Sequence, residues 1–228
     1  MDAVVHASSR ASRTLVAALA LLLAAACARG GPRAPAPAPV PPPDAAEEEV
    51  YRAVIDSVYV RSTGQRIAVV RQTLDTACTE FVRSLCGSAS DRMGLREEWW
   101  KDEAASPAWA GMRDDLLRKS AAAAPLSVAF GHEAGVVAID PAALDFTLAD
   151  ERPWPEFRER YGGAAGFVRF SRVGFAPDRS RALVSVQWEC GPTCGHRLAL
   201  SLERRAGGAW AIGEMFLMNS RAPVSSGQ

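Results

Sequence analysis

The densest group of side chains able to do chemistry is the run Glu189-Cys190-Gly191-Pro192-Thr193-Cys194-Gly195-His196. Oxidised, Cys190 and Cys194 would form a disulfide across a turn. Reduced, the two thiolates and His196 would bind zinc, with Glu189 or a more distant group as fourth ligand, since zinc ligands are often spaced C-x2–4-C. A pair of free thiols would instead make a redox dithiol. Three kinds of site therefore compete for the same residues.

The surrounding sequence favours the disulfide. No second Cys/His pair lies nearby to complete a zinc site. The segment Cys-Gly-Pro-Thr-Cys has one residue more than the thioredoxin-type Cys-Gly-Pro-Cys, and a strand is predicted after it. The helix N-terminus that lowers a thiol pKa would then be missing. We predict a disulfide between Cys190 and Cys194 and keep a zinc site of Cys190, Cys194 and His196 as the alternative.

Other catalytic patterns are missing from the sequence. His132-Glu133 lacks the second histidine of a His-Glu-x-x-His zinc helix, and no Gly-x-Ser-x-Gly elbow, P-loop or Gly-x-Gly-x-x-Gly motif occurs. Carboxylate pairs such as Asp114-Asp115 are typical of solvated surface. The sequence predicts no catalytic residue and no cofactor, and it favours a non-catalytic protein over an enzyme.

Two neighbouring tryptophans, Trp99 and Trp100, are the candidate binding residues. Adjacent side chains cannot both face the same way, so one is expected in the core and the other partly exposed. An exposed tryptophan there would line a ligand pocket or a partner surface.

The N-terminal segment 1–26 has the layout of a secretory signal peptide. Arg10 and Arg13 precede an uncharged run, and small residues lead into Cys27. The apolar run is shorter than the ~20 residues that a membrane-spanning helix needs. A cysteine directly after Ala-Ala resembles a bacterial lipoprotein signal, which implies that Cys27 is acylated and becomes the first residue. Ordinary secretion with Cys27 as a plain thiol is the alternative.

The domain organisation follows from composition. Residues 27–43 comprise the lipidated cysteine and a tether of alternating Ala and Pro, which favours extended polyproline II. Residues 44–220 are long enough for a single globular domain with its own core. Residues 221–228 are predicted to be a disordered tail.

Charge and cysteine content limit the partners. The chain has 26 basic and 26 acidic residues, and this balance argues against nucleic acid as a partner. With Cys27 assigned to lipid, an even number of cysteines remains, as expected for disulfides in an exported protein. Cys78 and Cys86 would lie ~12 Å apart on one straight helix, whereas a disulfide needs Cα atoms within ~7 Å. We expect them to pair, with segment 75–85 bent or looped.

The elements around these residues predict an α+β fold. Asp44 and Glu47 form a capping-box pattern ahead of an apolar stripe at helical spacing, and Gly64 ends that helix. A short strand over 66–70 follows, and 112–120 is helix-like. Four strands with turn residues between them are expected over 167–175, 182–190, 196–203 and 210–218. We expect the amphipathic N-terminal helix to pack on this C-terminal antiparallel β-meander.

The runs WPEFRERYGGAAGFVRFSRVGF and ALVSVQWECGPTCGHRLALSLERRAGGAWAI, with DDLLRKSAAAAPL upstream, resemble a group of uncharacterised exported bacterial proteins. The resemblance covers roughly residues 113–218. It implies export and carries over no catalytic residue. A helix followed by such a meander also resembles the nuclear-transport-factor-2-like and cystatin-like folds, although a shared fold would not give the function.

The sequence thus predicts a lipid-anchored protein of the bacterial cell envelope, facing the periplasm or attached to the outer membrane. Its expected partners are the membrane, through the anchor, and an envelope protein or small ligand. A non-catalytic binding or accessory role is favoured. An enzyme with a ligand pocket, supported by a partly exposed histidine or carboxylate of shifted pKa inside it, is the alternative. A purely structural protein would have a filled core without a cavity.

Overall fold

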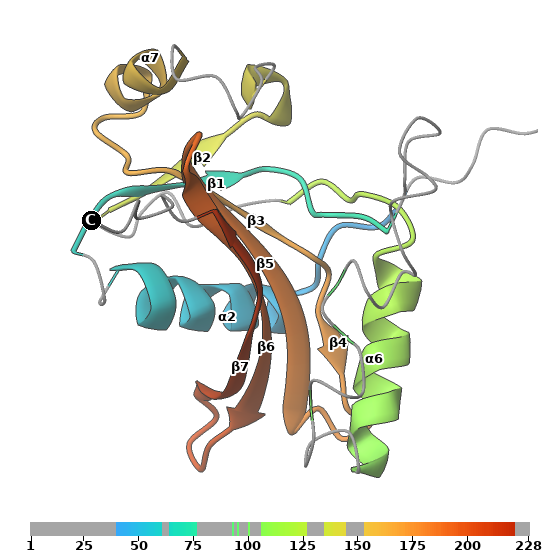
Figure 1. The fold of residues 1–228 in the computed structure, drawn as a ribbon. Coiled ribbons are helices and arrows are strands. Elements are labelled where there is room, and N and C mark those ends of the chain that lie inside the picture. Colours follow the sequence, from blue (N-terminus) through green and yellow to red (C-terminus); the bar gives the residue numbers. More distant parts are fainter. Residues whose placement is uncertain are drawn as a thin grey trace, which may run out of the picture. The chain divides into compact units, whose positions relative to one another are not determined.

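The computed structural model describes residues 40–60, 64–76, 93, 95, 100, 106–126, 135–144 and 153–221. These residues form three α-helices and a mixed seven-stranded sheet, so the predicted α+β class is confirmed (Figure 1). Residues Val40–Gln228 group as one compact unit. Of the helices in the described ranges, none has the length and apolarity needed to cross a bilayer. Predictions for Cys27, Cys78, Cys86, Trp99 and His132, and those for segments 1–39 and 222–228, lie outside the described residues.

The first helix, α2 (Ala45–Val54), begins with the predicted capping box. The Glu47 amide donates to Asp44 Oδ1 at 2.9 Å, and the Asp44 amide donates to Glu47 Oε2 at 3.1 Å. The chain then continues as a π-helix, η1 (Ile55–Val60), which the α-helical spacing did not predict. Gly64 closes this segment, with φ +64° and its amide donating to the Val60 carbonyl. Short π segments are frequent at functional sites.

The sheet has the strand order β2-β1-β3-β5-β6-β7, with β4 paired to β5. The antiparallel neighbours β3, β5, β6 and β7 form the predicted meander. β1 pairs in parallel with both β2 and β3, an extension of the sheet that the sequence did not predict. The strands span, in chain order, Ile67–Val70, Val136–Ile139, Phe167–Phe170, Gly174–Phe175, Arg181–Gly191, Cys194–Arg204 and Trp210–Arg221.

Helices cover both faces of the sheet. Tyr51, Ile55 and other residues of α2 and η1 pack on the face that carries Val168, Val184 and Leu200, which confirms the predicted cover. On the opposite face, α6 (Pro107–Lys119) packs beside β4 and β5, and α7 (Pro153–Arg160) packs over β1 and β3. Figure 1 shows α2 and α6 on opposite sides of β5, with the short helix η5 (Pro141–Leu144) following β2. This second layer was not predicted.

The strand expected over 167–175 is two strands, β3 and β4, separated by Ser171–Val173. At this break, the amides of Arg172 and Val173 bond to side chains, whereas the Ser171 amide still donates to the Ser185 carbonyl of β5 at 2.8 Å. The Arg172 amide donates to Ser120 Oγ at 3.2 Å, and the Val173 amide donates to Glu47 Oε1 at 2.9 Å. The alternation of apolar residues could not reveal the break, because the side chains that bond to it, Ser120 and Glu47, lie far away in sequence.

A buried ion pair occupies the same break. Arg172 Nε donates to Glu47 Oε1 at 2.9 Å and Nη2 donates to Oε2 at 2.7 Å, with the two side chains 6% and 1% exposed. Arg172 Nη1 also donates to the Pro41 carbonyl, so contacts with the domain begin ahead of the predicted boundary at Asp44. Burial by itself would lower the pKa of Arg172, but the hydrogen bonds and charge of Glu47 outweigh burial and raise it.

Gly174 lets β4 lie directly against α6. A Cβ at this position would overlap the Met112 carbonyl oxygen and the Leu116 side chain. Asp115 Oδ2 accepts from the Phe175 amide at 3.0 Å, and Lys119 Nζ donates to the Val173 carbonyl at 3.0 Å. The Ser171–Phe175 segment is therefore a structural junction between α6, the start of α2 and the sheet.

Replacing Glu47 with glutamine should destabilise the domain by about 3 kcal/mol, because it leaves the buried Arg172 guanidinium without a counter-charge. Urea unfolding followed by circular dichroism measures this. Glu49→Gln is the matched control, since Glu49 pairs with Arg204 at the surface and exposed pairs contribute about 0–1 kcal/mol. Equal stability losses in the two variants would contradict the assigned role of Glu47.

Candidate functional site

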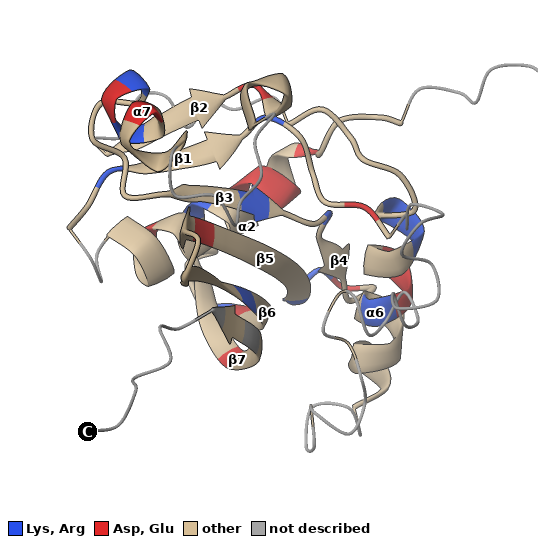
Figure 2. Cartoon of the chain, turned by 45° about the horizontal axis from the view of Figure 1, so that its top comes forward, with Lys and Arg blue, Asp and Glu red and all other residues tan. Residues whose placement is uncertain are grey.

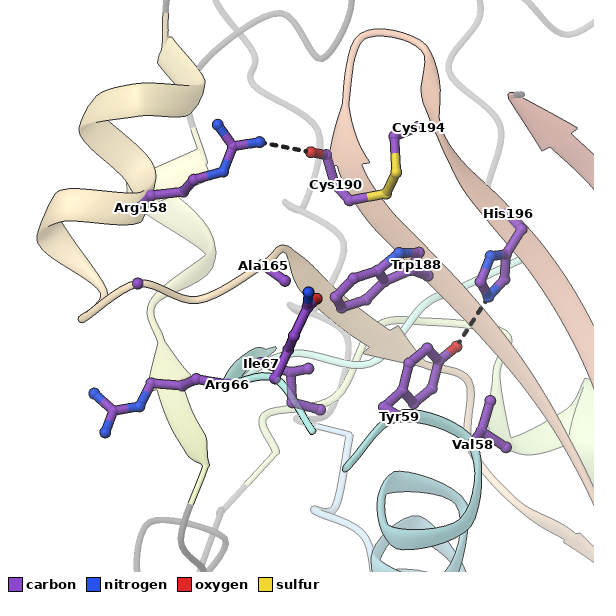
Figure 3. A pocket seen from close by; sticks show the side chains of 12 residues that line it. Val58, Tyr59, Arg66, Ile67, Arg158, Ala165, Trp188, Cys190, Cys194 and His196 are labelled. Atoms are coloured by element: carbon purple, nitrogen blue, oxygen red, sulfur yellow. Dashed lines mark hydrogen bonds between the residues drawn. A yellow bond between two sulfur atoms is a disulfide. The ribbon is translucent and has the colours of Figure 1, made fainter. Parts of the chain in front are cut away.

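A pocket of about 760 Å³ lies between η1, the start of β1, the turn after α7 and the β5–β6 hairpin (Figure 3). Its lining comes from three stretches that are far apart in the sequence, 58–67, 158–165 and 188–196. Its lining residues are Val58, Tyr59, Gln65, Arg66, Ile67, Arg158, Gly163, Ala165, Trp188, Cys190, Cys194 and His196.

Three rings form one wall of the pocket. The Tyr59 ring centre lies 5.2 Å from that of Trp188 and 6.1 Å from that of His196, with the tyrosine and histidine planes 4° apart. Tyr59 Oη and His196 Nε2 are 3.4 Å apart and share a hydrogen bond. Trp188 and His196 are directly paired across β5 and β6, so the hairpin places both rings on one face.

Burial keeps the two titratable groups of this wall uncharged at neutral pH. It lowers the pKa of His196 below its usual 6.5, since an imidazolium would lose hydration there. It also raises the pKa of Tyr59 above its usual value of 10. The wall thus offers a neutral imidazole and a protonated phenol, both able to form hydrogen bonds beside a flat apolar surface.

The predicted disulfide between Cys190 and Cys194 is confirmed, with Cα atoms 5.1 Å apart. Both cysteines line the pocket. With their sulfurs bonded to each other, neither supplies a thiolate, so the alternative zinc site of Cys190, Cys194 and His196 does not form in this structure. In the part of the chain that the structure describes, no group of three or more His, Cys, Asp or Glu side chains is arranged to hold a metal ion.

Glu189, the acidic residue of the same run, lies away from the pocket. Its side chain projects from the face of β5 opposite Trp188 and is 2% exposed. There Glu189 Oε1 accepts from Gln187 Nε2 at 2.7 Å, and Gln187 Oε1 accepts from Arg197 Nη2 at 3.2 Å. Because successive side chains of a strand point to opposite faces, the Glu189 carboxylate lies outside the pocket although it is adjacent to Cys190 in the sequence.

Two arginines stand on the α7 side of the pocket, across from the rings (Figure 3). Arg158 Nη2 donates to the Cys190 carbonyl at 3.3 Å, which joins α7 to the hairpin. Arg66 Nη1 donates to the Gly162 carbonyl at 3.1 Å. Gly162 has φ +61°, and a Cβ there would overlap the Arg66 guanidinium, so glycine is needed for this contact.

Of the two candidate tryptophans, Trp100 is the one that the structure describes, and it is buried, as expected for one of the pair, so it presents no binding surface. Trp100 is 1% exposed and packs against Trp109 with ring centres 4.5 Å apart, so it belongs to the core under α6. Among the described residues, the exposed large apolar side chains are Met215 and Leu217 on the edge strand β7, at 58% and 53% exposure.

The sequence predicts Cys190, Cys194 and His196 as site residues but gives no prediction for the rest of the pocket. Tyr59 belongs to the apolar stripe predicted for the N-terminal helix and Trp188 to the strand predicted over 182–190, and apolar spacing of this kind indicates burial and not a binding site. One signal was available: Trp188 precedes Cys190 by two residues and His196 follows Cys194 by two, so a hairpin closed by the disulfide pairs their positions. Arg66 and Arg158 carry no comparable signal.

Removing the disulfide with Cys190→Ser/Cys194→Ser should lower stability by about 2 kcal/mol, the loop-entropy value for so short a ring. Urea unfolding of this variant, against Thr193→Ser in the same turn as control, measures the loss. Peptide mapping without reductant should show the Cys190–Cys194 link directly. Two free thiols in protein isolated from its native compartment would contradict the assignment.

Comparison of the chain with models of known protein families, with curated proteins and with solved structures finds no match. The pocket, with Tyr59, Trp188, His196 and the two arginines, is therefore the feature that bears on function.

Proposed function

We propose that this protein is an exported, lipid-anchored binding protein that holds a small molecule in the pocket beside Tyr59, Trp188 and His196, without catalysing a reaction on it. The observation that carries the proposal is the pocket itself. Its volume of about 760 Å³ falls within the ~300–1,000 Å³ typical of small-molecule sites. A purely structural envelope protein would not need such a cavity.

The composition of the lining supports binding over catalysis. Aromatic and aliphatic surface dominates one side, and a few polar groups on the other side can fix the orientation of a ligand. None of the twelve described residues that line the pocket is Asp or Glu. An acid–base mechanism commonly pairs two titratable groups of different pKa, and in this lining the buried pair is a neutral histidine and a protonated tyrosine.

The walls of the pocket are fixed by covalent and hydrogen bonds. The disulfide closes the β5–β6 hairpin, and Arg158 joins the hairpin to α7. Gly166 allows β3 to approach β5 closely, because a Cβ there would overlap the Glu189 carbonyl oxygen. A preformed site binds more tightly because less conformational entropy is lost when the ligand enters.

Export and lipid attachment rest on the sequence of residues 1–43. The basic residues, the short apolar run and Cys27 fit a lipoprotein signal, and the Ala-Pro segment fits a spacer. The disulfide is compatible with an oxidising compartment outside the cytoplasm. The resemblance to exported bacterial proteins also supports this location.

An enzyme is the second candidate, because His196 lies in the pocket with a lowered pKa and shares a hydrogen bond with Tyr59. In that case His196→Gln would abolish turnover of a bound compound while leaving its binding largely intact. For a binding protein, the bound compound is recovered chemically unchanged.

Lipid attachment predicts that protein purified from membranes begins at Cys27 and carries a diacyl or triacyl mass on that residue. Mass spectrometry of the N-terminal peptide measures it, with Cys27→Ser as the control that should carry no acyl mass. An unmodified Cys27 thiol in the mature chain would refute the anchor.

The pocket proposal predicts that the neutral fluorescent compound N-phenyl-1-naphthylamine binds and brightens on the full-length Cys27→Ser chain, which avoids a lipid background. Ala165→Phe should weaken this binding at least tenfold, because the added ring fills space beside Trp188. Met215→Ser/Leu217→Ser is the matched control, since it removes the exposed apolar side chains of β7. The proposal fails if Ala165→Phe folds normally and binds the compound as tightly as the parent chain.

A further inference from the structure

We infer that the ligand of this pocket is a planar organic anion, with its ring against Tyr59 and Trp188 and its negative group at Arg66 and Arg158. The inference rests on the proposed binding function and adds the chemical class of the ligand. It follows from where charge, hydrogen-bond donors and flat apolar surface lie around one cavity.

The charge of the lining has one sign. Arg66 and Arg158 are its charged residues, and the described lining contains no carboxylate to neutralise them. Elsewhere the domain mixes its charges: α2, α6 and α7 each carry both blue and red segments in Figure 2. A cation would therefore meet repulsion at the pocket, whereas an anion would be attracted.

The two guanidinium groups keep donors for a ligand. Each makes one hydrogen bond within the described structure, Arg66 to the Gly162 carbonyl and Arg158 to the Cys190 carbonyl. A guanidinium has five N–H donors, so several remain on each side chain. The existing bonds hold the groups near the pocket, and paired N–H donors match the geometry of a carboxylate, sulfonate or phosphate.

The opposite wall suits a flat ring. Trp188 is 9% exposed and lies beside Tyr59, so a ligand ring there would contact aromatic and aliphatic surface together with Ile67. Figure 3 shows the rings on one side and the guanidinium groups on the other. This separation favours a molecule with an apolar body and an anionic end over a small inorganic anion, which would leave the ring surface uncovered.

Two fluorescent probes that share their rings test this inference: N-phenyl-1-naphthylamine, which is neutral, and 1-anilinonaphthalene-8-sulfonate, which carries a sulfonate. Arg66→Gln/Arg158→Gln should weaken binding of the sulfonate probe about fivefold, the combined effect of two exposed charge contacts. Loss of the Arg158–Cys190 and Arg66–Gly162 hydrogen bonds would affect both probes alike, so the fivefold loss is measured relative to the neutral probe. Raising the salt concentration should weaken only the sulfonate probe.

The control variant Arg160→Gln/Arg205→Gln makes the same change in net charge with arginines outside the pocket lining and should leave both probes unaffected. Inorganic phosphate at equal concentration should not displace the sulfonate probe. Suppose that Ala165→Phe weakens binding of the neutral probe, but Arg66→Gln/Arg158→Gln leaves binding of the sulfonate probe unchanged. The inference is then wrong and the binding function stands. If neither probe responds to Ala165→Phe, the binding function itself is wrong.

Discussion

The fold depends first on one buried carboxylate. The two oxygens of Glu47 accept hydrogen bonds from the Asp44 amide, the Val173 amide and two nitrogens of Arg172, with the side chain 1% exposed. A charge can be buried at such a depth only when its partners replace water almost completely. The start of α2, the break between β3 and β4 and the Pro41 backbone are thereby held in one arrangement.

That arrangement positions the pocket at the other end of the same helix. With its first turn fixed on Arg172, α2 runs along the sheet and passes into η1, where Tyr59 meets Trp188 and His196. The hairpin is closed independently by the disulfide between Cys190 and Cys194. The aromatic wall thus forms where two separately stabilised pieces of the fold meet.

The charges that hold the fold together are separate from those beside the pocket. Glu47 and Arg172 pair with each other inside the fold. Glu189 accepts a hydrogen bond from Gln187 on the face of the sheet opposite the pocket. The cations left beside the cavity, Arg66 and Arg158, are near the surface and keep donors for a partner. Cys190, Cys194 and His196 of the run 189–196 therefore line the pocket, whereas Glu189 of the same run does not.

Local signals in the sequence determined much of the fold: the capping box of Asp44 and Glu47, the alternating strands of the meander and the disulfide across its turn. Each depends on residues close together in the chain, where spacing alone dictates geometry. Only the tertiary structure decided that Glu47 pairs with Arg172, 125 residues away, and that β1 joins the sheet in parallel. It also brought Tyr59, Arg66 and Arg158 to the hairpin. Such neighbours are chosen by the packing of whole elements, and hydrophobic periodicity reports which face of an element is buried but not what buries it.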